Sequence, residues 1–400
     1  MYIPRFLSPK LFEALKHFPA VLITGPRQSG KTTFLLHEAS KETDYVSFDD
    51  PLERSFALTD PNGFLDRFMD RPVIIDEIQY VPEILPYLKM RIDRERKRNG
   101  KWLLTGSQQF HLMKNVSESL AGRIAILELL PFSIPEIMEI TKKTGVNIES
   151  IVWNGGYPEP AIAPEKRELW MRSYIQTYIE RDLRHLQNVK DLRSFELFLG
   201  LSAAHHGQAF NTAILSRQAG VSLPTIKSWA GILEASYLCF LLPPWFKNYG
   251  KRLIKTPKLY FIDAGLVCTI TRQPDGRSAM GGAMGGAIFE GLIISEAIKV
   301  FAMMGKRPDI FFWRSHDGLE VDLIIQIGSK LYPAEIKQTS TPTVKHMEPL
   351  NRFKALAPSD TAGTGIIVCS IKKPTPLPSN NMAIPWHYFP EWLMTKLKGT

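Results

Sequence analysis

Short apolar runs alternate with polar segments of helical length through the first third of the chain. Residues 18–24 (FPAVLIT), 72–75 (PVII) and 101–104 (KWLL) each have the length and composition of a buried strand, and residues 124–129 form a further apolar run. Because buried strands alternate here with helical segments, the pattern predicts an α/β fold.

The middle of the chain has helical periodicity. Residues 170–189 predict one amphipathic helix, and residues 212–219 and 223–234 predict two shorter helices joined by a tight turn. Two apolar runs, 237–242 and 259–262, follow and can pair as strands. This order of elements predicts a helix-turn-helix followed by a β wing.

The last third begins with a glycine-rich stretch, residues 272–287, which lacks apolar periodicity and predicts a flexible linker. A helix is expected over residues 288–304. Two strands, 318–327 and 330–338, then flank Gly328 and Ser329, which predicts a hairpin with a two-residue turn.

Composition describes a globular chain. Its 400 residues are 44% hydrophobic and 22% charged, enough for two to four domains with sizeable cores. No apolar run reaches the roughly 18 residues of a membrane span, and no signal-peptide pattern opens the chain, so we expect no membrane association and a cytoplasmic location. The three cysteines, Cys239, Cys268 and Cys369, lie too far apart to indicate a disulfide framework or a cysteine zinc site.

The net charge of +9 is unevenly distributed. Residues 1–150 hold equal numbers of basic and acidic residues, whereas residues 151–286 hold 16 Lys and Arg against 10 Asp and Glu. A basic middle segment is what a nucleic-acid-binding module needs to meet phosphates, although solvated lysines on any surface have the same composition.

A phosphate-binding motif follows the first apolar run. Gly25 to Thr32 match G-x-x-x-x-G-K-[ST] between a predicted strand and a predicted helix. Backbone N–H groups of such a loop cradle the phosphates of a nucleotide. Lys31 is expected to reach the β- and γ-phosphates of ATP, and Thr32 to hold Mg²⁺. The predicted nucleotide-binding residues are Gly25, Pro26, Arg27, Gln28, Ser29, Gly30, Lys31, Thr32 and Thr33.

A pair of carboxylates directly follows the apolar run at residues 72–75. Asp76 is the candidate for the magnesium shell, and Glu77 is the candidate base that polarises the attacking water. The strand at residues 101–104 leads to Ser107, a candidate sensor of the lytic water or of the γ-phosphate; a plain turn is the alternative there.

Arg123 precedes the apolar run at residues 124–129. The phosphate loop, Asp-Glu-Ile-Gln at 76–79, Thr-Gly-Ser at 105–107, Leu-Ala-Gly-Arg at 120–123 and Pro-Phe-Ser at 131–133 together resemble the prokaryotic AAA-type ATPases that carry a C-terminal domain of unknown function. The resemblance spans nearly the whole chain. It implies that Arg123 reaches the γ-phosphate of a neighbouring subunit in a homo-oligomer, such as a ring; an intramolecular salt bridge is the alternative.

The helix-turn-helix offers polar residues to a DNA groove. Apolar positions such as Leu215, Ile226 and Trp229 are expected inside, with Gly220 in the turn. Basic residues near the wing are expected to contact phosphates, which position a protein without reading sequence. A protein-docking module is the alternative. The predicted DNA-binding residues are Ser222, Thr225, Lys227, Ser228, Lys251, Arg252 and Lys255.

The hairpin brings acidic residues together. With Gly328 and Ser329 as its turn, Asp322 lies opposite Glu335, and Glu320 lies opposite Lys337, all on one face. Two facing carboxylates are unfavourable unless a cation joins them. This arrangement can bind Mg²⁺ and activate a water for attack on a phosphodiester; a solvated strand face is the alternative.

The run containing Glu-Val-Asp (320–322) and Glu-Ile-Lys (335–337) resembles the core of PD-(D/E)xK nucleases. The resemblance implies that Asp322 and Glu335 are metal ligands, that Lys337 orients water or acts as an electrophile, and that Glu290 is an auxiliary carboxylate. Many such domains keep the fold without cleaving, and Val321 stands where the family pattern has a proline.

These patterns predict an ATPase that binds DNA and couples ATP hydrolysis to remodelling or translocation on duplex or branched DNA. An ATP-gated, magnesium-dependent endonuclease and a nucleotide-dependent signalling or scaffold protein are the alternatives. The expected domains are an ATPase core (1–130), a helical lid (131–200), a winged helix-turn-helix (201–271), a linker (272–287) and an α/β restriction-endonuclease-like domain (288–400).

Overall fold

The computed structural model describes residues 2–107, 116, 118–140, 147–177, 192–247 and 255–399. The chain divides into two compact units. The first contains residues 1–132 with two short later segments, 235–237 and 302–306. The second contains residues 133–234, 238–301 and 307–400.

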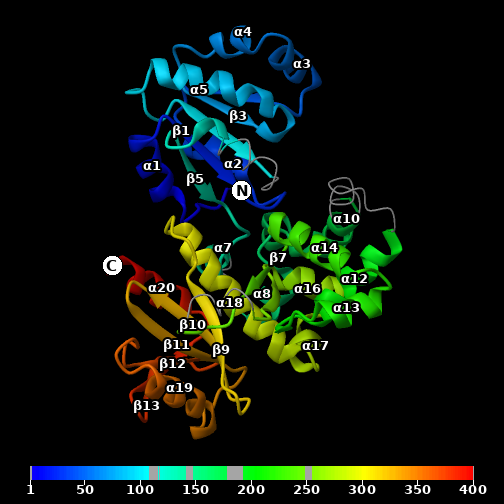
Figure 1. Cartoon of the computed structure of the whole chain (residues 1–400), viewed down its shortest axis with the longest axis vertical. Helices are drawn as coiled ribbons and strands as arrows, with labels where there is room; N and C mark the ends of the chain where they lie inside the picture. The colour runs from blue at the N-terminus through cyan, green and yellow to red at the C-terminus, as the bar shows by residue number, and fades with distance from the viewer. Residues whose placement is uncertain are drawn as a thin grey trace. The chain divides into compact units, whose positions relative to one another are not determined.

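A five-stranded parallel sheet forms the centre of the first unit (Figure 1). Its strand order is β2-β3-β4-β1-β5, and the predicted apolar runs form four of these strands. The strand that the sequence pattern missed is β2, which is short and has an exposed tyrosine. The strands are β1 (Ala20–Thr24), β2 (Asp44–Ser47), β3 (Val73–Asp76), β4 (Trp102–Gly106) and β5 (Ile124–Glu128).

Helices cover both faces of this sheet. Along β1, Ala20 and Leu22 pack into a core with α3, α4 and α5, whereas Val21 and Ile23 pack into a second core with α1 and α2. This alternation follows from the two-residue period of a strand and explains why β1 is buried at every position. The helices are α1 (Ser8–His17), α2 (Lys31–Glu38), α3 (Pro51–Thr59), α4 (Pro61–Asp66) and α5 (Leu85–Arg94), and two 3₁₀ turns occupy Ile78–Tyr80 and Pro82–Ile84.

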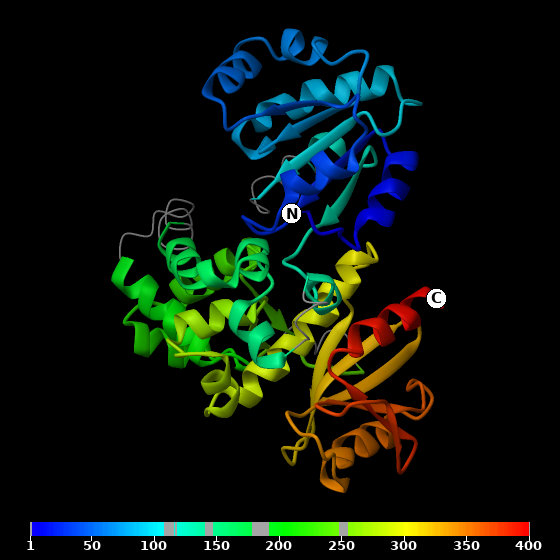
Figure 2. The same cartoon turned by 180° about the vertical axis from the view of Figure 1, so that it is seen from behind.

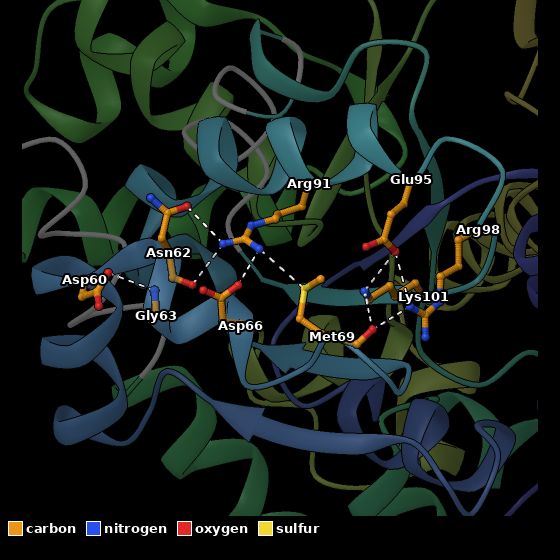
Figure 3. Close-up of polar contacts among 9 residues, drawn as sticks. All are labelled: Asp60, Asn62, Gly63, Asp66, Met69, Arg91, Glu95, Arg98 and Lys101. Atoms are coloured by element: carbon orange, nitrogen blue, oxygen red, sulfur yellow. Dashed lines mark hydrogen bonds and ion pairs between the residues drawn. The ribbon is translucent and has the colours of Figure 1, made fainter.

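Polar contacts tie α4 and α5 to the sheet (Figure 3). Arg91 on α5 forms an ion pair of 2.5 Å with Asp66 on α4. Lys101, just before β4, donates a hydrogen bond of 2.9 Å to the carbonyl oxygen of Met69 and lies 3.4 Å from Glu95. These contacts link the helical layer to the strand that ends at the predicted sensor.

Helices dominate the first part of the second unit. Of the predicted long helix at 170–189, α10 covers the first part and ends at Tyr174, residues 175–177 continue as a π-helical turn, and residues 178–189 lie outside the described part of the chain. Within the described ranges no helix is long and apolar enough to cross a membrane. The helices are α7 (Ile134–Ile140), α8 (Ile148–Asn154), α9 (Pro158–Ile162), α10 (Arg167–Tyr174), α12 (Leu192–Ala204) and α16 (Ala264–Ile270), with a 3₁₀ turn at Pro164–Lys166.

Two helices and a three-stranded antiparallel sheet follow α12. Helices α13 (Thr212–Ala219) and α14 (Leu223–Ala235) occupy the two predicted helical segments. Gly220 between them has a φ of 69°, in the left-handed region that favours glycine. The strands have the order β6-β8-β7, and they are β6 (Gln208–Ala209), β7 (Cys239–Leu242) and β8 (Lys258–Phe261).

The predicted flexible linker at 272–287 is wrong. Helix α17 (Gly276–Gly281) and the start of α18 (Gly285–Met303) occupy most of it. Asp275 caps α17 by accepting a hydrogen bond of 2.7 Å from the Ser278 N–H, and Ala279 and Met280 are buried. A Cβ atom at Gly276 would overlap the backbone of Glu149, so this glycine permits close packing against α8.

A six-stranded mixed sheet forms the C-terminal part of the second unit (Figure 2). Its order is β13-β14-β12-β11-β10-β9, and α19 (Val344–Leu356) packs on β10, β11 and β12. The apolar core on this side includes Val321, Ile324, Leu350 and Phe353. The strands are β9 (Ile310–Arg314), β10 (Glu320–Ile327), β11 (Lys330–Ile336), β12 (Gly365–Cys369), β13 (Thr375–Leu377) and β14 (Asn381–Pro385), and the last helix is α20 (Phe389–Lys398).

Candidate functional site

The phosphate loop connects β1 to α2. Gly30 is the N-cap of α2 and has no side chain to cap it, so the first N–H groups of the helix have no side-chain acceptor from the cap. The Ser29 hydroxyl is buried and has no hydrogen-bond partner among the described residues. Behind the loop, Arg5 donates hydrogen bonds to the carbonyl oxygens of Ser29 (3.1 Å) and Leu130 (2.7 Å). Arg5 therefore holds the loop in place, and the first N–H groups of α2 and the Ser29 hydroxyl are available to bind an anion.

Lys31 lies against its own loop. Its Nζ donates hydrogen bonds to the carbonyl oxygens of Gly25 (3.2 Å) and Pro26 (2.8 Å). Burial lowers the pKa of Lys31 to about 8, while the Glu77 and Asp76 carboxylates act in the opposite direction. A phosphate close to Nζ would replace the carbonyl acceptors with an anionic partner and favour the charged amine.

Asp76, at the end of β3, accepts hydrogen bonds from several hydroxyl groups. Thr32 Oγ1 lies 2.9 and 3.1 Å from its two carboxylate oxygens, and the Tyr45 hydroxyl donates to it at 3.2 Å. Thr105 of β4 also donates to Asp76. The structure therefore brings together the two residues predicted to hold magnesium, Thr32 and Asp76.

Glu77 and Ser107, the candidate base and the candidate sensor, lie in contact. Ser107 Oγ lies 3.3 Å from Glu77 Oε2, and Gln79 contacts both residues, with its Nε2 3.2 Å from Ser107 Oγ. Glu77 has a left-handed backbone (φ 56°, ψ 46°), which is uncommon for a residue with a side chain. Its backbone N–H donates a hydrogen bond of 3.0 Å to Thr105 Oγ1. These contacts hold the candidate base beside the candidate sensor.

The loop and its carboxylates fit a magnesium nucleotide. Ser29 Oγ and Gln79 Oε1 are buried polar atoms that lack partners within the described ranges. Thr32 and Asp76 supply the hard oxygen atoms that Mg²⁺ prefers. Of the other predicted loop residues, Arg27 donates a hydrogen bond of 3.0 Å to the Tyr80 hydroxyl, and Gln28 has a φ of 63°.

Arg123 forms an ion pair within its own chain. Its Nε and one terminal nitrogen lie 2.7 and 3.0 Å from the two carboxylate oxygens of Asp93 on α5. The hydrogen bond from Arg123 lowers the pKa of Asp93 and raises that of the arginine. This geometry is the intramolecular alternative to a residue that reaches a neighbouring subunit.

The predicted DNA-binding residues lie at the start of α14 and near β8. Ser222 and Lys227 are exposed, Thr225 and Ser228 are half-buried, and the hydroxyls of Ser222 and Thr225 lie 2.8 Å apart. Of the wing residues, Lys255 is exposed, whereas Lys251 and Arg252 lie outside the described residues.

Asp322 on β10 and Glu335 on β11 both form an ion pair with the same lysine. Lys337 Nζ lies 2.9 Å from Asp322 Oδ2 and 2.8 Å from Glu335 Oε1. Pairing of Ile327 with Lys330 and of Leu323 with Ala334 confirms the predicted register of the hairpin. Burial and then Asp322 raise the pKa of Glu335 to about 8. Burial lowers the pKa of Lys337, but the carboxylates of Asp322 and Glu335 outweigh it and raise that pKa above its usual range.

Glu290 and Glu320 are held by a different lysine, which the sequence did not predict. Lys258 on β8 lies 3.1 Å from Glu290 Oε1 and 2.5 Å from Glu320 Oε1. The Tyr260 hydroxyl also donates to Glu290. The expected pairing of Glu320 with Lys337 lies beyond the paired part of the hairpin, which ends at Leu323 and Ala334. Lys337 contacts Asp322 and Glu335, and Glu320 contacts Lys258 instead.

The expected three-carboxylate metal group does not form. In the described part of the chain no group of three or more His, Cys, Asp or Glu side chains is arranged to hold a metal ion. Asp322 and Glu335 by themselves fit a Mg²⁺ ion, because Glu335 Oε2 is buried and has no hydrogen-bond partner among the described residues. Mg²⁺ is commonly bound by one or two carboxylates, with water and substrate phosphates completing its shell.

The phosphate loop and the carboxylates on its parallel sheet define a P-loop AAA-type ATPase. A family model described as an AAA domain matches residues 17–138. Models described as domains of unknown function match residues 146–276 (DUF8612) and 285–389 (DUF4143). An uncharacterized protein of Mycobacterium tuberculosis is 31% identical over 345 residues, which are 85% of this chain and 75% of the relative. The chain therefore belongs to the family of AAA-type ATPases that carry a C-terminal domain of unknown function, as its motifs indicated.

More distant similarities add no function. An uncharacterized protein of Methanocaldococcus jannaschii is 26% identical over 271 residues, 60% of each chain. The Thermotoga maritima RuvB Holliday junction branch migration motor aligns with a TM-score of 0.31 and 18% identity over 59% of this chain and 89% of that chain. Protein VC1899 of Vibrio cholerae aligns with a TM-score of 0.23 and 11% identity over 95% of this chain and 97% of that chain. Similarity at this level does not define a shared activity.

Sequence reasoning missed several residues of both sites. Thr105 and Gln79 stand within the motifs that carried the family resemblance, so their positions offered a signal. Tyr45, Lys258 and Tyr260 offered none, because they reach their carboxylates only through strand pairing and packing between distant segments.

Proposed function

We propose that this protein hydrolyses ATP at the phosphate loop and couples hydrolysis to remodelling of, or translocation on, duplex or branched DNA. The observation that carries the catalytic half is the convergence of Thr32 with Asp76 and of Glu77 with Ser107 at the ends of neighbouring strands. A magnesium ion bound there would neutralise charge on the phosphates.

The chain's own residues have separable roles in this reaction. Lys31 and the first N–H groups of α2 bind the phosphates. Glu77 accepts a proton from the attacking water, and Ser107 and Gln79 keep its carboxylate in place. Release of Arg123 from Asp93 on assembly would let it act on a neighbouring subunit's nucleotide in a homo-oligomeric ring.

Support for DNA as the partner comes from the segment around α13, α14 and the three-stranded sheet. Its elements follow the order of a winged helix-turn-helix, and residues 151–286 carry the excess of basic charge. Ser222 and Lys227 at the start of α14 and Lys255 before β8 are exposed, as contacts to a groove and to phosphates require.

ATP turnover measured without DNA and with linear duplex, single-stranded DNA or a four-way junction tests this proposal. We expect one DNA form to stimulate turnover and leave the DNA uncut, and Lys31→Ala to abolish turnover. Paired Lys227→Ala and Lys255→Ala changes should weaken the stimulation but keep the basal rate. If no DNA form changes the rate of ATP turnover at about 0.1 M salt, the proposal that DNA is the partner is contradicted, and a signalling or scaffold protein is favoured.

A second activity, magnesium-dependent cleavage of DNA, is favoured by one observation. Asp322 and Glu335 face each other in the predicted register, and one buried oxygen of Glu335 lacks a partner within the described residues. Lys337 would orient the attacking water. Cleavage that requires Mg²⁺ and is lost in Asp322→Asn supports this activity, and cleavage that persists in Asp322→Asn contradicts it.

A further inference from the structure

The carboxylate cluster of the second unit has two halves. In one half, Lys337 joins Asp322 to Glu335. In the other, Lys258 joins Glu290 of α18 to Glu320 of β10. Lys258 comes from β8, in the three-stranded sheet β6-β8-β7, and not from the hairpin that carries the nuclease-like motif.

Lys258 is built into this position. Its side chain is only 9% exposed, and Nζ lies 5.5 Å from the centre of the Phe312 ring. The hydroxyl of Tyr260, two residues along β8, also donates to Glu290. Residues 258 and 260 of one strand therefore point to one face and hold the same carboxylate.

Charge balance shows what this lysine does. With all groups ionised, the four carboxylates Glu290, Glu320, Asp322 and Glu335 face the ammonium groups of Lys258 and Lys337, and the exposed guanidinium of Arg314 lies 4.0 Å from Glu320. At least one negative charge is left uncompensated, and one divalent cation offsets it. The partnerless oxygen of Glu335 belongs to the half that lacks Lys258, so that half is the one with a free ligand atom.

We propose that Lys258 is a positioning residue that acts as a resident cation between Glu290 and Glu320 and limits the cluster to one divalent ion, bound by Asp322 and Glu335. This inference rests on the second proposed activity, because it requires a metal ion at Asp322. Without Lys258, Glu290 and Glu320 have no bridging ammonium, and the cluster gains capacity for a second ion.

Titration of the nucleotide-free protein with Mn²⁺, followed by calorimetry, tests this inference. The ions that count are those lost when Asp322→Asn alone, or Asp322→Asn together with Glu290→Gln, is added to each variant. We expect one such ion in the unmodified chain and two in Lys258→Met. Lys258→Arg, which keeps the charge, should retain one ion. Lys255→Met, a matched change at an exposed lysine three residues earlier, should also retain one.

Thermal unfolding separates a positioning role from a structural one. We expect Lys258→Met to melt at a lower temperature than the unmodified chain in EDTA and to regain more of its melting temperature on addition of Mn²⁺. A merely structural lysine would lower the melting temperature equally with and without metal. Lys258→Gln replaces Lys258→Met if the latter does not fold.

The possible failures are distinguishable. A loss of only one ion from both the unmodified chain and Lys258→Met, with equal affinity and even when both Asp322→Asn and Glu290→Gln are added, would overturn the role of Lys258 and leave the metal site standing. No Asp322-dependent ion in any variant would contradict the metal site itself, and with it this inference.

Discussion

The phosphate loop and the carboxylate cluster use the same kinds of residues in different ways. Each combines a buried lysine with Asp and Glu. In the phosphate loop, Lys31 and Thr32 are neighbours in the sequence, and Asp76 and Glu77 follow one strand. In the cluster, Lys258, Glu290, Asp322 and Glu335 come from four separate elements. A site built from a local motif is visible in the sequence, whereas a site assembled by packing is visible only in part.

The largest effect is expected at the local site. Lys31→Ala removes the charge that stabilises the transferred phosphate, so we expect ATP turnover to fall about 100-fold or more. The melting temperature without nucleotide should change little, since the hydrogen bonds of Nζ to the described residues go to the carbonyl oxygens of its own loop. Steady-state phosphate release measures the first effect and thermal unfolding the second. Turnover close to that of the unmodified chain would refute the assignment of the loop.

Glu77→Gln separates binding from chemistry at the same site. Glutamine keeps the shape of the side chain but cannot accept the proton, so we expect turnover to fall about 100-fold while nucleotide affinity is retained. Fluorescent nucleotide titration beside the turnover assay provides the test. A parallel loss of affinity and rate would show that Glu77 binds the nucleotide and is not the base.

Much of the local site could be predicted because its residues are close in the sequence. The glycines and Lys31 of the loop, the acidic end of β3 and Ser107 at the end of β4 all lie where their strands predicted. Tyr45 could not be predicted, because it reaches Asp76 across the pairing of β2 with β3.

The cluster was predictable only within the hairpin. The turn at Gly328 and Ser329 set the register and so placed Asp322 near Glu335. Lys258 could not be placed in the cluster from the sequence, because no local pattern reports contact between β8, α18 and β10. The glycines at 276–285 were misread as a linker because composition alone cannot distinguish flexible glycines from closely packed ones.

A pH effect of intermediate size is expected at β8. His206 accepts a hydrogen bond of 3.1 Å from the Phe261 N–H, and burial lowers the pKa of His206 from 6.5 to about 3. Between these values the unfolded chain binds a proton that the folded chain excludes. His206 therefore lowers stability as the pH falls below about 6.5, by up to about 1.4 kcal/mol per pH unit.

Urea denaturation at pH 7.5 and pH 5.5 checks this effect. We expect the unmodified chain to lose more stability between these two pH values than His206→Gln does. Equal losses in the two proteins would show that other groups cause the pH dependence.

The smallest effect is expected at the ion pair on the first unit. Asp93→Ala frees Arg123 and, because the pair is exposed, should leave the melting temperature nearly unchanged. If Arg123 acts on a neighbouring subunit, Arg123→Ala lowers ATP turnover and Asp93→Ala does not. Equal turnover in both variants would assign the pair a local role only. Sedimentation of each variant is the control for assembly.

The most direct test of the account is one assay of both chemistries on one sample. ATP turnover and integrity of a four-way junction would be followed together for the unmodified chain, Lys31→Ala and Asp322→Asn in Mg²⁺. We predict that Lys31→Ala loses turnover, that Asp322→Asn keeps DNA-stimulated turnover, and that any cleavage disappears only in Asp322→Asn. Loss of turnover in Asp322→Asn, or turnover without response to DNA, would contradict the account of an ATPase that acts on DNA through a separate second site.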